Sequence, residues 1–193
     1  MSASKRDILL KKALEVFYRN GFHATGMDML VTETGVSKTS MYKHFRTKED
    51  LILASLRLRD ELFRNWLTRR MEELAEEPRD QLLALFDALG EWFEQDDFSS
   101  CMFIKASGEY PAADHPIHAN AAEHKRLIRH YLVDLAEKAG ARDPAQLASG
   151  LLLLKEGAIV SAHIQGPTGV AADAKAAAQL IMADAFSAGA ESQ

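Results

Sequence analysis

The sequence predicts an all-α fold of about nine helices. Residues that favour helices, such as alanine, leucine and glutamate, dominate the 193-residue chain, which contains only five prolines. Apolar residues recur at helical spacing, and no segment alternates β-branched and polar residues as a half-buried strand does. Because 47% of the residues are hydrophobic, the chain can bury a packed core instead of remaining disordered.

The first helix is expected between residues 4 and 20. Gly21 suits the position just after its last turn, where glycine readily takes the left-handed backbone conformation. A stripe of apolar side chains at helical spacing is expected to face the core. This stripe consists of Ile8, Leu9, Ala13, Val16 and Phe17.

Two short helices are expected on either side of a turn at Gly35. Thr25 is expected to cap the second helix, with Asp28 three residues later in a variant of the capping box. Ser37 is expected to cap the third helix. This succession predicts a helix-turn-helix at about residues 27–46, an arrangement with which proteins read DNA.

The fourth helix is expected to begin after Thr47, with Asp50 at its third position, and to continue to about residue 75. That length is sufficient to connect two domains. A proline restricts the residue before it, so the helix should end before Pro78. A fifth helix is then expected at residues 79–95.

Prolines and glycines delimit the remaining helices. They are expected at residues 101–110, from Pro116 to Gly140, from the cap Asp143 to Gly166, and at about residues 170–187. The eighth helix is almost wholly apolar between residues 147 and 164, so we expect it to be buried on most sides. No stretch is expected to reach the roughly 18–20 apolar residues of a membrane span, and no membrane association is expected.

The net charge of −5 is unevenly distributed. Residues 1–50 contain nine lysines and arginines and six acidic residues, a balance of +3, whereas the rest of the chain has a balance of −8. A basic segment around the predicted helix-turn-helix, followed by an acidic body, fits a small DNA-binding head on a larger domain. The acidic body argues against a nonspecific architectural DNA protein.

Cys101 is the single cysteine, so no intrachain disulfide is possible. The first residues lack the apolar core of a signal peptide, and a cytoplasmic location is expected. Cys101 is interpreted as a small buried residue, with a redox-sensing thiol as the alternative.

A set of fixed spacings runs from residue 17 to residue 51. It consists of Phe17, Gly21-Phe22, Ala24-Thr25, Gly35-Val36-Ser37, Tyr42-Lys43-His44-Phe45, Lys48-Glu49 and Leu51. With these residues the sequence resembles the TetR family of one-component transcriptional regulators. A looser resemblance to some members extends to Cys101-Met102-Phe103 and Glu156-Gly157-Ala158. Thr39 departs from the pattern, because many relatives carry glycine at this position.

The resemblance implies a DNA-binding domain at residues 4–64 and an effector-binding and dimerisation domain at residues 65–190. It further implies a cytoplasmic homodimer whose two heads read a palindromic operator. A small-molecule effector would release the DNA, as expected for a repressor. No cofactor and no enzymatic activity are expected.

The third helix is expected to read base edges in the major groove, because it follows the turn. Tyr42, Thr25 and Lys48 match positions that relatives use on phosphates, and Thr25 is interpreted as both a cap and a phosphate contact. Met41 and Phe45 are expected in the core of the head. The candidate DNA-binding residues are Thr25, Ser37, Lys38, Thr39, Ser40, Tyr42, Lys43, His44 and Lys48.

Polar side chains on apolar helical faces predict an effector pocket in the second domain. Glu156 and His163 share one face of the eighth helix, and His124 and Tyr131 share one face of the seventh. A buried carboxylate or imidazole needs a partner, which is either a ligand or a core hydrogen-bond network. The candidate pocket residues are Phe86, Phe93, Phe103, His124, Tyr131, Glu156 and His163.

Small residues on the last two helices allow close helix approach and predict a four-helix dimer interface. Packing within one chain is the alternative. The candidate interface residues are Gly150, Ala158, Ser161, Ala162, Ala174, Ala178, Ile181 and Ala185.

Two further hypotheses rest on histidines. Glu109, His115, His118 and His124 cluster in the sequence and suggest a metal-sensing alternative, but no cysteine joins them at ligand spacing. An enzyme using Cys101 and His124 is another alternative, although no phosphate loop, nucleophile elbow or His-Glu-x-x-His motif is present. We therefore expect no metal site and no catalytic site.

Overall fold

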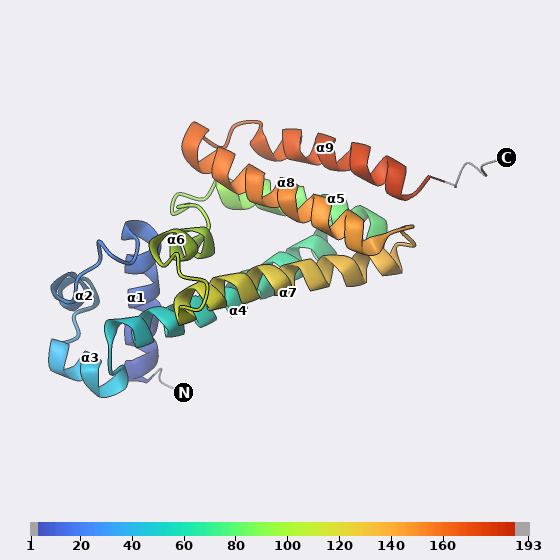
Figure 1. Cartoon of the computed structure of the whole chain (residues 1–193). Helices are drawn as coiled ribbons and strands as arrows, with labels where there is room; N and C mark the ends of the chain where they lie inside the picture. The colour runs from blue at the N-terminus through green and yellow to red at the C-terminus, as the bar shows by residue number, and fades with distance from the viewer. Residues whose placement is uncertain (1–3, 188–193) are drawn as a thin grey trace. The chain divides into compact units, whose positions relative to one another are not determined.

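The computed structural model describes residues 4–187. The structure is 78% helical, and the described residues form nine helices and no strand, which confirms the predicted all-α class (Figure 1). The helices are α1 (Lys5–Asn20), α2 (Met27–Thr34), α3 (Lys38–His44), α4 (Lys48–Leu74), α5 (Pro78–Phe93), α6 (Met102–Glu109), α7 (Pro116–Lys138), α8 (Pro144–Gln165) and α9 (Val170–Ala185).

Local capping signals place most helix boundaries where the sequence predicts them. The Ser37 Oγ accepts from the Ser40 N–H at 3.3 Å and caps α3. Thr47 and Asp50 form a reciprocal capping box, with both hydrogen bonds at 3.0 Å. Gly35 ends α2 in the left-handed conformation, with φ 71°.

The predicted cap of α2 is wrong by one residue. Gly26 occupies the N-cap position, and no side chain bonds to the free N–H groups there. The Thr25 hydroxyl instead donates to the Gly21 carbonyl at 2.6 Å, across the turn after α1. Thr25 therefore stabilises the α1–α2 connection and does not cap the helix that follows.

Backbone contacts divide the chain into two compact units. In the described part, unit 1 contains residues 4–63 and 101–125, and unit 2 contains residues 64–100 and 126–187. α4 and α7 each contribute to both units. The first cut lies near the predicted domain boundary at residues 64 and 65, but α6 and the first half of α7 group with the head. The predicted domain end at residue 190 lies outside the described residues.

In unit 1, α1, α2 and α3 share a small core. Leu9, Phe17 and Phe22 are fully buried, and Leu30 of α2 and Met41 of α3 pack against the same interior. Ile8 was expected in this core but is 43% exposed, while Leu14 and Tyr18 are buried. The buried face of α1 therefore includes Leu14 and Tyr18 and leaves out Ile8.

In unit 2, α5, α8 and α9 lie side by side (Figure 1). Leu82, Phe86 and Leu89 of α5 are fully buried. α8 differs from the prediction that it is buried on most sides, because Leu153 is 74% and Ile164 73% exposed. Only one side of α8 meets α9 and α5 within the chain, so its apolar composition does not translate into burial all round.

Among residues 4–187, α8 is long and apolar enough to cross a membrane by length and composition, with a mean hydropathy of 1.4. This finding corrects the expectation that no stretch approaches such a span. A core helix of a soluble protein meets the same criterion. Lys155 and Glu156 lie in the middle of α8, where charged groups would be costly in a bilayer.

Candidate nucleic-acid interface

α3 separates its polar side chains from its apolar ones. Met41 and Phe45, at its buried side and its C-terminal end, are 1% and 6% exposed, as predicted for the core of the head. The predicted DNA-binding side chains of α3 and its cap lie on the other side and are exposed or, in the case of Ser40, half-buried. The exposed ones are Ser37, Lys38, Thr39, Tyr42, Lys43 and His44. This arrangement leaves a polar, basic helical face free to contact DNA.

Lys38 has an ionic partner outside α3. Its Nζ lies 3.4 Å from Asp28 Oδ1 at the start of α2, and the two side chains are 53% and 94% exposed. A pair this exposed contributes little to stability and exchanges readily with another anion. Lys38 can therefore leave Asp28 for a base edge or a phosphate.

Thr25 and Lys48 have different environments from the α3 residues. Thr25 is fully buried with its hydroxyl donated to Gly21, so a DNA contact by its side chain stays a prediction. Lys48, the first residue of α4, is half-buried, and this burial lowers the pKa of its ammonium, against the opposing effect of Glu109 and Glu49. A lysine at a helix start suits a phosphate contact.

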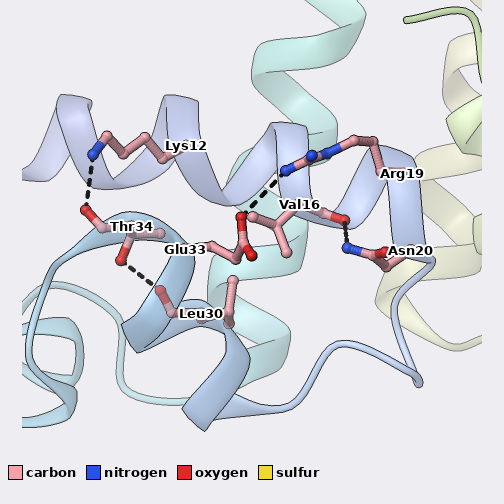
Figure 2. A network of polar contacts seen from close by, with 7 residues as sticks. All are labelled: Lys12, Val16, Arg19, Asn20, Leu30, Glu33 and Thr34. Atoms are coloured by element: carbon pink, nitrogen blue, oxygen red, sulfur yellow. Dashed lines mark hydrogen bonds and ion pairs between the residues drawn. The ribbon is translucent and has the colours of Figure 1, made fainter.

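Polar contacts between α1 and α2 set the orientation of the motif (Figure 2). The Lys12 ammonium donates to the Thr34 carbonyl at 3.0 Å, where α2 ends. The Thr34 hydroxyl donates to the Leu30 carbonyl at 2.6 Å, and the Arg19 guanidinium lies 3.4 Å from Glu33. Because the part-buried Lys12 contact ties the C-terminal end of α2 to α1, the turn into α3 starts from a defined position.

Two of the predicted pocket residues meet in unit 1. The rings of Phe103 and His124 stack with centroids 3.6 Å apart. The His124 Nδ1–H donates to Asp60 Oδ1 at 2.7 Å, and His124 is only 2% exposed. The sequence predicted that the buried imidazole needs a partner but did not identify Asp60, which lies 64 residues away.

The other five pocket candidates lie in unit 2, three of them on α5 and α7. Phe86 and Phe93 are buried in α5. Tyr131 is half-buried and lines a recess of about 70 Å³ between α4 and α7. Burial raises the pKa of its hydroxyl. The recess is lined by Arg64, Leu67, Thr68, Leu127, Ile128 and Tyr131.

Glu156 and His163 do not occupy the inward face predicted for them. Glu156 is half-buried, while Val160 and His163, on the same face of α8, are exposed. The inward face instead carries Lys155, which is fully buried and donates to Glu156 Oε1 at 2.8 Å. The shift of roughly one residue changes which charge is buried, because neighbouring positions lie about 100° apart on a helix. Nothing in the apolar pattern of α8 marked Lys155.

The metal hypothesis is not supported by the placement of its residues. Glu109 binds the backbone N–H of Phe22, the His118 Nδ1–H donates to the Tyr110 carbonyl at 2.9 Å, and His124 pairs with Asp60. No group of three or more potential ligands is close enough to hold a metal ion within residues 4–187.

Cys101 is buried at the N-cap of α6, as predicted by its interpretation as a small buried residue. The Lys125 ammonium donates to its Sγ at 3.3 Å. This contact places a positive charge beside the thiol, whereas His124 directs its Nδ1 to Asp60. The geometry does not assemble the cysteine–histidine pair that an enzyme would require.

The predicted dimer-interface residues pack mainly within one chain. Ala158, Ala162, Ala174 and Ala178 are all buried between the helices of unit 2. A Cβ added to Gly150 would lie 3.5 Å from the Ile181 Cδ1, so this glycine also serves the α8–α9 contact. Close approach of α8 and α9 explains these small residues without a second copy. Ser161 and Ala185 are half-buried, and Ile181 is 37% exposed.

Comparison with known proteins agrees with this geometry. The family described as bacterial regulatory proteins, tetR family, matches residues 9–55. The chain is 25% identical to the HTH-type transcriptional regulator YjdC of Escherichia coli strain K12 over 155 residues, which cover 80% of this chain and 81% of the relative. It is 34% identical to the HTH-type transcriptional repressor KstR2 of Mycolicibacterium smegmatis over 95 residues, 48% of this chain and 44% of the relative.

Among solved structures, SCO4454, a TetR-family transcriptional regulator from Streptomyces coelicolor, superposes with a TM-score of 0.88 at 26% identity, over 94% of this chain and 96% of that one. The fold, the exposed polar face of α3 and these likenesses define a helix-turn-helix transcriptional regulator that binds DNA. The similarity of this chain to SCO4454 covers the body as well as the head. The chain belongs to the TetR family. Its relatives are regulators, and it is not an enzyme.

Proposed function

We propose that this chain is a cytoplasmic, ligand-responsive repressor that binds a palindromic operator as a homodimer. The observation that carries the proposal is the polar face of α3, where Lys38, Thr39 and Lys43 are exposed while Met41 is buried. Repression is supported by the similarity to KstR2, a transcriptional repressor, and is typical of the family. The acidic body keeps DNA contact to the heads, because its charge repels phosphates.

A homodimer is supported by apolar surface on α8 and α9. Leu153, Val160 and Ile164 follow one another at helical spacing on one face of α8 and are exposed. Leu180 of α9 is 77% exposed. Exposed apolar side chains gathered on one helical face are typical of an interface, and a two-fold axis would bring the same face of a second copy onto them. The proposed interface thus uses the outward faces of α8 and α9 rather than the alanines between them.

An effector site in the body is supported by polar groups beside apolar surface. In unit 2, the Tyr131 recess combines aliphatic side chains with the Arg64 guanidinium and the Thr68 hydroxyl. Its volume of about 70 Å³ is far below the roughly 300 Å³ of typical ligand sites. A larger effector would therefore have to separate this part of α4 from α7, which is a direct way to move the helix that enters the head.

The proposal is tested in three steps with the purified full-length chain. Light scattering at micromolar concentration should give the mass of a dimer, and a monomer would contradict the proposed interface. In vitro selection from a random duplex library should return a palindromic sequence. A thermal-shift screen of small molecules should then identify ligands that raise the unfolding midpoint and weaken binding to the selected duplex. A ligand that strengthens binding would reverse the proposed direction of regulation.

A further inference from the structure

Two charged side chains on α6 bind the backbone at the corner between α1 and α2, all within unit 1. The Lys105 ammonium donates to the Tyr18 carbonyl at 2.8 Å. The Glu109 carboxylate accepts from the Phe22 N–H at 2.9 and 3.1 Å and also from the His23 N–H. Lys105 and Glu109 are four residues apart, so one face of α6 presents both to the corner.

Each side chain binds backbone groups in the last turn of α1 or just beyond it. The Tyr18 carbonyl belongs to the last turn of α1, where carbonyls lack partners within the helix and carry partial negative charge. A lysine ammonium complements that charge. Phe22 and His23 follow the helix end, and their N–H groups converge on a single carboxylate. Burial lowers the pKa of Lys105, and Glu109 and Cys101 oppose this effect.

The corner is shaped for this contact. Gly21 has φ 81°, a conformation that favours glycine, and a Cβ placed there would lie 2.8 Å from Glu109 Oε1. The Tyr110 ring, next along the chain from Glu109, packs on the His23 ring with centroids 4.7 Å apart. A side chain at residue 21 would therefore displace the Glu109 carboxylate from its present position.

We propose that Glu109 and Lys105 are positioning residues for DNA binding. They lie on α6, outside the helix-turn-helix, and hold the α1–α2 corner from which α2 and then α3 depart. A fixed backbone conformation at this corner sets the orientation in which α3 meets the major groove. The inference rests on operator binding under the proposed function and needs neither the effector nor the direction of regulation.

The decisive variant is Glu109→Gln in the full-length chain, with the probe being the duplex that in vitro selection recovers on the wild-type protein. Glutamine keeps the shape of the side chain but offers one acceptor oxygen and turns an NH₂ group toward the corner. Hydrogen exchange of the Phe22 and His23 amides should accelerate. Affinity for the selected duplex should fall about 5- to 10-fold, the size of the effect of losing one ordinary hydrogen bond. Affinity for random-sequence duplex should change less than twofold, because no phosphate contact is removed.

The control is Glu61→Gln, which removes the same charge from an exposed position of unit 1 and should leave both affinities at wild-type values. Lys105→Met is the second variant, and it decides the question if Glu109→Gln does not fold. The proposal is overturned if folded variants bind the selected duplex as tightly as the wild-type protein, or if affinities for both duplexes fall equally. A selection that yields no preferred sequence would instead count against the proposed operator binding, before any variant is made.

Discussion

Asp60 and His124 connect α4 to α7 through a hydrogen bond of 2.7 Å, which the His124 Nδ1–H donates to Asp60 Oδ1. The imidazole is almost completely buried, and Phe103 stacks on its ring. Replacing Asp60 by alanine leaves a buried donor without this acceptor. We expect Asp60→Ala to lower the free energy of unfolding by about 1–3 kcal/mol, measured by urea denaturation.

An exposed histidine–aspartate pair within α7 provides the control for this prediction. His130 and Asp134 lie 3.9 Å apart with side chains 68% and 49% exposed. Asp134→Ala should therefore change stability very little. Asp60→Asn should cost less than Asp60→Ala, since its amide oxygen still accepts. Equal effects of Asp60→Ala and Asp134→Ala would show that the buried pair adds nothing beyond a surface contact.

How far the sequence predicted this molecule depends on the range of the interaction concerned. Ser37, Thr47 and Asp143 bond to backbone groups three residues away, so their caps are visible in the sequence. The exposed face of α3 follows from the same local pattern. Asp60 and Glu109 act on partners more than sixty residues away, and no local signal indicates them.

The errors on α8 have a different physical cause. Its composition is apolar nearly all round, so periodicity cannot distinguish the side that packs within the chain from the side left exposed. Leu153 is exposed and Lys155 fully buried, the reverse of what hydrophobicity alone indicates. The buried face of α8 can be told from its exposed face only from the packing of α8 on α9 and α5.

Lys38 is expected to contribute to sequence preference. Its side chain is exposed at the start of α3 and is held only by the surface pair with Asp28. Lys38→Ala should weaken binding to the selected duplex by about 1–3 kcal/mol and relax preference at one base pair of each half-site. Competition between singly mutated duplexes measures both effects. Lys138→Ala, which removes the same charge from an exposed position of the body, should change neither. Retained preference in Lys38→Ala would exclude base readout by this lysine.

Lys48 is expected to act on phosphates instead. Lys48→Gln should weaken binding to every duplex by a similar factor and reduce the slope of log affinity against log salt by about one per head. Titrations at several salt concentrations, with selected and random duplexes side by side, give both quantities. A change in sequence preference without a change in slope would assign Lys48 to base readout.

The Arg70–Glu91 pair predicts a pH dependence of stability in unit 2. Arg70 donates two hydrogen bonds of 2.7 Å to the Glu91 carboxylate and holds the pKa of that carboxyl below its usual value. A carboxyl with a lowered pKa in the folded state stabilises the fold at pH above its unfolded pKa, and this contribution is lost as pH falls through the folded pKa. Glu91 is 46% exposed, so the contribution is small and sensitive to salt.

The pH dependence is measured as the difference in unfolding midpoint between the wild-type chain and Glu91→Ala. This difference should be largest at neutral pH and vanish in acid. Glu137→Ala, at an exposed position of α7, should show no such trend. A difference between wild type and Glu91→Ala that persists in acid would mean that the side chain stabilises by packing and not by charge.

The exposed face of α8 predicts the behaviour of the dimer. In an isologous interface each substitution occurs twice, so Leu153→Glu would place two carboxylates in an apolar contact between copies. Light scattering should show a monomer, and affinity for the full palindromic duplex should fall toward that of a single head. Leu62→Glu alters a leucine that is also exposed, 51%, but lies on α4, and it should remain dimeric. If Leu153→Glu stays dimeric and Leu62→Glu does not, the copies associate through α4 instead, and the apolar face of α8 has another partner.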